Sequence, residues 1–291
     1  MARILAVANQ KGGVGKTTTV HALGVALAEL DQRVLLVDLD PQACLTYSVG
    51  LDPDTLVRSL HDVFLRRAAI TEVVHTLGPR LDIVPATIDL AGSEVLLLTR
   101  TGREHVLARA LEALSANYAV VLVDCPPSLG VLTINGLTAA ESVLVPLQCE
   151  ALSHRGVGQL LDTIEDVRAF ANGDLRVRGI IPTMFDGRTR HGREILAGVG
   201  SRYGLPVLEP PVPKSVRFAE APAKGCSILD YARGSPGAEA YRALARALDA
   251  DMREPAGEEP GDGLVGERGE AAAEERAHEE QARREEVHAT R

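Results

Sequence analysis

Short apolar stretches recur along this chain, and between them apolar residues return every three or four positions. The stretches have the composition of strands that are buried on both faces. They occupy residues 4–8, 33–37, 81–86, 119–123, 142–148 and 178–184. Helical spacing spans residues 17–30, 89–118 with a break near Thr101 and Gly102, 153–170 and 236–252, and Asp89 is a candidate N-cap. This alternation predicts an α/β fold with a doubly wound, mainly parallel sheet flanked by helices.

A glycine-rich turn joins the first predicted strand to the first predicted helix. Residues 9–18 read Asn-Gln-Lys-Gly-Gly-Val-Gly-Lys-Thr-Thr. Glycines let the backbone curl so that successive N–H groups face an anion, and the helix N-terminus adds partial positive charge. Lys16 supplies a charge for the β- and γ-phosphates of a nucleotide, and the Thr17 hydroxyl suits Mg²⁺. The expected nucleotide-binding residues are Lys11, Gly12, Gly13, Val14, Gly15, Lys16, Thr17 and Thr18.

Carboxylates follow two further predicted strands at their carboxyl ends, where ligands bind in parallel α/β sheets. Asp38 and Asp40 end one strand, and Asp124 ends another. Asp124 has the position of a Walker B residue, which holds the hydration shell of Mg²⁺. Loop-capping aspartates and an ordinary tight turn are the structural alternatives for these segments. The residues after Asp124 that are candidates for a nucleotide-sensing switch are Pro127, Ser128 and Gly130.

The glycine-rich loop departs from the usual phosphate-binding pattern, because Gln10 replaces its first glycine and Lys11 opens the loop. The run Lys-Gly-Gly-Val-Gly-Lys-Thr-Thr resembles the deviant Walker A motif of the ParA/MinD family of P-loop ATPases. Residues 37–42 (VDLDPQ) and 124–130 (DCPPSLG) resemble that family's switch I and switch II. The resemblance implies catalytic roles for Lys11, Lys16 and Asp40.

In that family the first lysine crosses a dimer interface to the partner's phosphates, which implies this role for Lys11. A solvated lysine beside an ordinary loop is the alternative. By the same resemblance Asp40 would orient the attacking water, and Asp38 would support Mg²⁺ through its hydration shell. The expected metal-site residues are therefore Thr17, Asp38 and Asp124.

Two later segments, residues 185–190 and 212–222, resemble ParA chromosome- and plasmid-partitioning ATPases, so the resemblance covers about residues 1–250. It places Met184 and Pro213 at the nucleotide. It implies hydrolysis of ATP with Mg²⁺, a homodimer around ATP, binding of double-stranded DNA without sequence preference, and a ParB-type centromere-binding partner. Residues 151–156 depart from the pattern, because many relatives have an aromatic residue and ALEG there.

Charge is unevenly distributed along the chain. The net charge is −9, but residues 254–291 hold 12 acidic and 5 basic residues, which leaves −2 on residues 1–253. Residues 176–224 carry nine Lys and Arg against four acidic residues. Such a strip binds phosphate backbones without reading sequence, and a solvated face with local salt bridges is the alternative. The candidate DNA-contacting residues are Arg188, Arg190, Lys214, Arg217 and Lys224.

Composition separates an acidic C-terminal tail, residues 254–291, from residues 1–253, which the resemblance identifies as a ParA-like P-loop ATPase domain. The tail has too few apolar side chains to offset chain entropy, so we expect it to be disordered. The chain shows neither a signal peptide nor an apolar run of membrane-spanning length. Its four cysteines are widely spaced, as in proteins of reducing compartments. We expect a cytoplasmic, nucleoid-associated protein that does not bind membranes.

Other functions fit parts of this pattern. A MinD-like, membrane-cycling division-site ATPase needs a C-terminal amphipathic helix with basic and apolar faces, whereas this tail is acidic. An orphan ParA-like ATPase would position a protein cargo on the nucleoid. An iron–sulfur reductase of related fold would need two suitably placed cysteines, for which Cys44 and Cys125 are the candidates.

Overall fold

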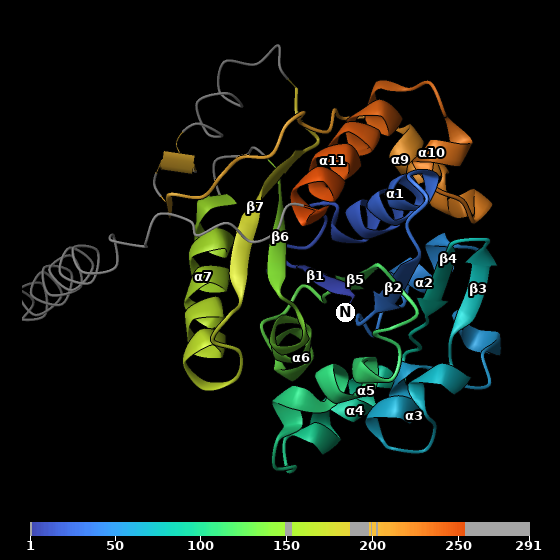
Figure 1. The fold of residues 1–291 in the computed structure, drawn as a ribbon, viewed down its shortest axis with the longest axis vertical. Helices are drawn as coiled ribbons and strands as arrows, with labels where there is room; N and C mark the ends of the chain where they lie inside the picture. The colour runs from blue at the N-terminus through green and yellow to red at the C-terminus, as the bar shows by residue number, and fades with distance from the viewer. Residues whose placement is uncertain (1, 149–152, 187–197, 199, 202, 254–291) are drawn as a thin grey trace, which may run out of the picture. The chain divides into compact units, whose positions relative to one another are not determined.

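A computed structural model describes residues 2–148, 153–186, 198, 200, 201 and 203–253. The chain divides into two compact units, Met1–Asp251 and Met252–Arg291, and the sheet lies in the first. The predicted tail, residues 254–291, lies outside the described residues. Seven strands of the described part form one sheet in the order β3-β4-β2-β5-β1-β6-β7 (Figure 1). The strands are β1 (Arg3–Val7), β2 (Val34–Asp38), β3 (His75–Gly78), β4 (Leu81–Val84), β5 (Val120–Asp124), β6 (Ser142–Gln148) and β7 (Arg176–Thr183).

The described sheet is parallel except at one edge. β1 lies between β5 and β6, β2 lies between β5 and β4, and β7 extends the sheet beyond β6, all in parallel register. Only the edge strand β3 pairs antiparallel, with β4. The predicted mainly parallel, doubly wound sheet is therefore confirmed. β3 escaped prediction because it is four residues long and carries the polar residues His75 and Thr76.

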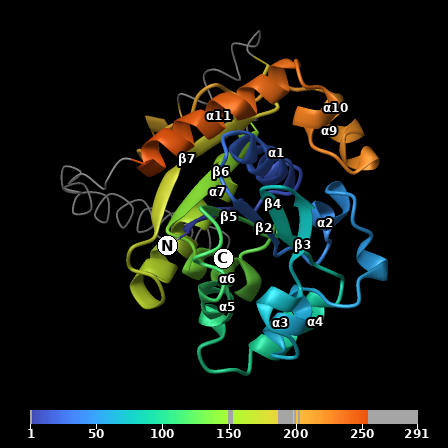
Figure 2. The ribbon, with the colours of Figure 1, turned by 45° about the vertical axis from the view of Figure 1, so that its right-hand side comes forward.

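Helices cover both faces of the sheet (Figures 1 and 2). One group comprises α1 (Lys16–Glu29), α9 (Arg217–Glu220), η4 (Pro222–Lys224), α10 (Ile228–Tyr231) and α11 (Pro236–Arg253), and α2 (Cys44–Ser48) contacts α1 and η4. The other group comprises α3 (Leu60–Phe64), α4 (Leu90–Leu97), α5 (Val106–Glu112), α6 (Val131–Ala139) and α7 (Ser153–Phe170). The short 3₁₀ turns η1 (Pro53–Thr55), η2 (Ile70–Glu72) and η3 (Arg103–His105) lie in connections. None of the described helices has the length and apolarity needed to cross a bilayer.

Successive residues of each central strand pack against opposite helical layers, because side chains alternate between the two faces of a strand. In β2, Leu35 and Val37 join the core cluster that includes side chains of α3 to α7. Leu36 faces α1, where a Cβ on Gly24 would lie 2.5 Å from its Cδ2, so glycine permits close packing of α1 on the sheet. Asp89 lies at the N-cap position of α4, as predicted, but its backbone angles are helical and its side chain makes no capping hydrogen bond.

Candidate nucleotide-binding site

The glycine-rich loop connects the central strand β1 to α1, as predicted. Gly13 and Gly15 have φ angles of 75° and 90°, a left-handed conformation that glycine adopts without strain. A Cβ added at Gly12 or Gly13 would meet no atom within 4 Å. The loop therefore borders open space at the carboxyl end of the sheet, where an anionic ligand can approach its backbone.

Two side chains distant in sequence fix the loop in place. The Asn9 amide donates to the carbonyl of Pro146 in β6 at 2.8 Å, and its oxygen accepts the Lys11 backbone N–H at 2.9 Å. The Thr183 hydroxyl at the end of β7 donates to the Val14 carbonyl at 2.7 Å. Sequence reasoning missed both, because their partners are 137 and 169 residues away along the chain.

Lys16 lies inside this loop. Its side chain folds back so that Nζ donates to the Lys11 carbonyl at 3.2 Å, and only 7% of the residue is exposed. Burial lowers the pKa of Lys16, while the negative charges of Asp124 and Asp40 oppose that shift. Lys16 therefore stands beside the carboxylates that the sequence assigned to the same site.

Asp124 and Asp38 are register partners at the ends of the adjacent strands β5 and β2, and both are fully buried. Burial and the charge of Asp38 raise the pKa of Asp124 well above its ordinary value, and the nearby Thr17 hydroxyl and Lys16 offset part of the rise. Neither carboxylate oxygen of Asp124 has a hydrogen-bond partner among the described residues.

These orphaned oxygens of Asp124 fit a hydrated Mg²⁺, which keeps several waters and takes few protein ligands. The Thr17 hydroxyl near Asp124 is a suitable direct ligand. In the part of the chain that the structure describes, no group of three or more His, Cys, Asp and Glu side chains could hold a metal on its own. A cation here would thus depend on nucleotide phosphates for the rest of its coordination.

Asp38 differs from Asp124 because its oxygens already have protein donors. It accepts hydrogen bonds from the Thr46 N–H at 2.8 Å, the Thr46 hydroxyl at 2.7 Å and the Asp40 N–H at 3.2 Å. Burial raises the pKa of Asp38 to about 6, against the effect of these donors. Asp38 therefore anchors α2 to the sheet, a role that the sequence did not reveal.

The two predicted switches flank the loop. Asp40 is 8% exposed and accepts the Gln42 N–H at 2.9 Å, so its position is fixed next to Lys16. Ser128 and Gly130 lie where the chain leaves β5, and a Cβ on Gly130 would lie 2.5 Å from Oε1 of Glu94 in α4. The predicted switch II thus abuts α4.

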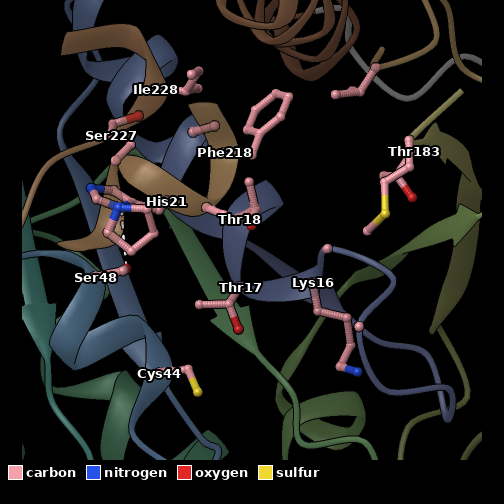
Figure 3. A pocket seen from close by; sticks show the side chains of 18 of the residues that line it. Lys16, Thr17, Thr18, His21, Cys44, Ser48, Thr183, Phe218, Ser227 and Ile228 are labelled. Atoms are coloured by element: carbon pink, nitrogen blue, oxygen red, sulfur yellow. Dashed lines mark hydrogen bonds between the residues drawn. The ribbon is translucent and has the colours of Figure 1, made fainter. Parts of the chain in front are cut away.

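A cavity of about 910 Å³ opens above the loop (Figure 3). Its lining includes every predicted nucleotide residue except Lys11 and Val14, together with Asp40 and Pro127. Met184 and Pro213, assigned to the nucleotide by resemblance, both line it. So does Lys214, which was predicted to contact DNA. Unpredicted lining residues come from α1, α2 and the C-terminal segments, and they include His21, Ser48, Phe218, Ser227, Ile228 and Tyr241.

The remaining DNA candidates fall into two groups. Arg188 and Arg190 lie outside the described residues. Arg217 in α9 and Lys224 in η4 are both exposed, and these two short elements contact each other. The structure therefore brings Arg217 and Lys224 onto neighbouring elements.

This site is that of a P-loop nucleotide-binding protein, and comparisons with known proteins narrow the class. A family model described as an AAA domain matches residues 2–177. The sporulation initiation inhibitor protein Soj of Bacillus subtilis is 43% identical over 252 residues, covering 86% of this chain and 100% of Soj. The chromosome partitioning protein ParA of Caulobacter vibrioides is 43% identical over 255 residues, covering 87% of this chain and 96% of ParA.

A solved structure shows the same fold at higher identity. It is described as cobyrinic acid a,c-diamide synthase from Mycobacterium smegmatis with bound ADP and magnesium. It is 52% identical with a TM-score of 0.79, and the match covers 87% of this chain and 96% of that one. A second structure of that protein contains an ATP analog and magnesium. This chain belongs to the ParA/Soj family of P-loop ATPases, which confirms the resemblance drawn from its sequence.

Proposed function

We propose that this chain is a Mg²⁺-dependent ATPase that dimerises around ATP, binds double-stranded DNA without sequence preference and drives chromosome or plasmid partitioning with a ParB-type partner. The observation that carries the proposal is the geometry of Lys11. Its N–H donates to Asn9 and its carbonyl accepts from Lys16, so its backbone is held at both ends. A lysine on so rigid a loop can reach a fixed external target at low entropic cost.

Hydrolysis follows from the remaining residues. Lys16 and the loop N–H groups hold the β- and γ-phosphates, and Thr17 and Asp124 would hold Mg²⁺ with its waters. When bound, Mg²⁺ neutralises charge that develops on the phosphates. Asp40 is close to Lys16 and fixed by Gln42, so it can orient a water for attack on the γ-phosphate. Asp38 holds α2, the helix that follows switch I, through the Thr46 N–H.

Partner binding and location follow from the same proposal. Soj and ParA, which are chromosome-partitioning or sporulation proteins by name, match the chain over nearly their full lengths. We propose that this chain likewise acts in chromosome or plasmid partitioning, in the cytoplasm and on the nucleoid. Exposed Arg217 and Lys224 would contact DNA phosphates, and dimerisation would double this surface. We propose no separate role for residues 254–291.

Alternative functions have weaker support. An iron–sulfur cluster would need accessible thiols, but Cys125 is fully buried in the core. A diamide synthase, as the Mycobacterium smegmatis protein is described, would convert an acid substrate to its diamide. A MinD-like ATPase would bind liposomes in the presence of ATP. An orphan positioner of a protein cargo would share the ATP and DNA steps and differ only in its partner.

DNA binding gives the sharpest test. We would measure fluorescence anisotropy of a labelled random-sequence duplex, with ATP or ADP, at several salt concentrations. Wild type should bind with ATP, and Arg217→Glu should weaken binding and reduce the salt slope by about one per lost phosphate contact, thus about two per dimer. Arg67→Glu is the matched control, because Arg67 is an exposed arginine beyond α3. Equal loss in both variants, or no ATP-dependent binding by wild type, would contradict the DNA step.

A further inference from the structure

One short segment both lines the nucleotide cavity and carries two of the DNA candidates. It comprises α9 and η4, residues 217–224, and we call it the α9–η4 segment. Phe218 and Pro222 line the cavity, and Figure 3 shows Phe218 among the cavity residues. Arg217 and Lys224 of the same segment are exposed. The segment that borders a bound nucleotide therefore also presents both exposed cations.

The helix α2 forms another part of the cavity wall, through Cys44 and Ser48. It follows switch I, and the Thr46 N–H and hydroxyl tie it to Asp38 at the end of β2. Asp40 of switch I lines the cavity as well, so the terminal phosphate of ATP, which ADP lacks, would border switch I. The position of α2 is therefore linked to switch I.

The α9–η4 segment and α2 meet through two glycines. Gly50 follows α2 and Gly225 follows η4, with left-handed φ angles of 89° and 63°. A Cβ added at Gly225 would lie 2.8 Å from the Gly50 Cα, and one added at Gly50 would lie 3.3 Å from the Gly225 carbonyl oxygen. Backbone meets backbone here, and no flexible side chain lies between. A shift of α2 is therefore passed on to η4, because close-packed groups transmit displacement.

The other end of the α9–η4 segment is held by α11. The Phe218 ring packs edge-on against Tyr241, with the ring centroids 6.0 Å apart. A Cβ added at Gly237 would lie 2.6 Å from Cζ of Phe218, so α9 lies close to the α11 backbone. Because α9 is held in this way, a displacement at Gly225 tilts η4 rather than moving the whole segment.

We propose that the Gly50–Gly225 contact is a positioning device that transmits the state of switch I to the DNA-binding surface. It places Lys224, and with it Arg217, according to the position of α2. This inference rests on the proposed function, because it needs ATP-dependent DNA binding. The placement of these cations matters because charge attraction falls with distance and is screened within about 10 Å at 0.1 M salt.

The test uses two variants that press this contact apart. Gly50→Ala and Gly225→Ala should bind ATP in calorimetry as wild type does, because neither residue lines the cavity. In fluorescence anisotropy with ATP, both should bind a labelled random-sequence duplex about tenfold more weakly, with the salt slope reduced by about two per dimer. Gly102→Ala is the matched control and should equal wild type. Its φ angle is 66°, but the nearest atoms to an added Cβ are Arg109 side-chain nitrogens at 3.6 and 3.9 Å.

A double substitution identifies the cation that the contact positions. Lys224→Gln alone should reduce the salt slope by about two per dimer, because each protomer loses one phosphate contact. If Gly225→Ala acts by displacing Lys224, adding Lys224→Gln to it should weaken DNA binding no further, since coupled changes are not additive. Full additivity of the two changes would overturn the inference.

The outcomes separate the inference from the proposed function. If wild type shows no ATP-dependent DNA binding, the DNA step of the proposed function fails as well. If wild type binds DNA and both folded glycine variants equal it, only the inference fails.

Wild type alone gives a second test, which holds even where a variant does not fold. The amides of residues 224–226 donate to the carbonyls of Ala221 and Pro222. Their hydrogen exchange should slow when a non-hydrolysable ATP analog replaces ADP, because the contact then holds η4 in one position. Equal exchange with the two nucleotides would overturn the inference.

Discussion

Thr46→Val should destabilise the nucleotide-free protein strongly, although the two side chains have nearly the same shape. Thr46 is fully buried, and its hydroxyl donates to Asp38 at 2.7 Å and accepts the Ala86 N–H at 2.9 Å. Valine removes a hydrogen bond to a charged group, worth about 1.5–3 kcal/mol, and strands a buried N–H, which costs about 1–3 kcal/mol. The free energy of unfolding should therefore fall by roughly 3–5 kcal/mol.

Thermal unfolding followed by circular dichroism measures this loss. In a domain of this size each kcal/mol shifts the midpoint by about 2–4 °C, so the midpoint should fall by roughly 6–20 °C. Thr138→Val is the matched control, because the Thr138 hydroxyl is buried and has no hydrogen-bond partner among the described residues. That variant should equal or exceed wild type, since an unpaired polar group is removed. Equal midpoints for the two variants would refute the view that Thr46 anchors Asp38.

Four further outcomes test the site. Lys16→Ala should weaken ATP binding by at least about 100-fold in calorimetry, because the main phosphate cation is lost. Lys11→Ala should still bind ATP but remain monomeric in sizing chromatography, and normal dimerisation would contradict the cross-dimer role. Asp40→Ala should bind ATP yet hydrolyse it about 100-fold more slowly in a phosphate-release assay. The pKa of Asp38 in the folded protein lies above its ordinary value. The free energy of unfolding therefore falls as pH rises from about 4 through 6, where Asp38 ionises more readily in the unfolded chain. Urea titrations should therefore show Asp38→Asn gaining stability relative to wild type between pH 4.5 and 7.5, and a constant difference would exclude this titration.

The local pattern of apolar and glycine residues was sufficient to predict most strands of the sheet and the phosphate-binding loop. Mainly apolar runs predicted six of the seven described strands, because strands buried on both faces hold few polar residues. The loop at residues 9–18 could be recognised from glycine spacing, since its chemistry lies in consecutive backbone groups. The position of Asp124 at the end of β5 could be predicted, because the apolar run before it forms that strand. Each inference needed only neighbours in the sequence.

What the sequence could not give depends on partners brought together by packing. The Asn9 and Thr183 side chains hold the loop through carbonyls on distant segments, and Asp38 is occupied by Thr46. The residue type alone does not predict such hydrogen bonds, because an Asn or Thr side chain can donate to many different acceptors. Asp89 occupies the predicted N-cap position of α4 without a capping hydrogen bond, because its backbone is helical and a capping side chain needs an extended one.

The same division applies to the ligand cavity. The phosphate end is determined by the sequence, because one continuous loop forms it. Its other walls come from α2, from residues near Pro213 and from segments that precede α11, and these meet only in the folded chain. His21 alone reads as an ordinary helix residue. In the folded chain its Nδ1 lies 3.2 Å from the Ser48 hydroxyl of α2, and such a contact is set by tertiary geometry.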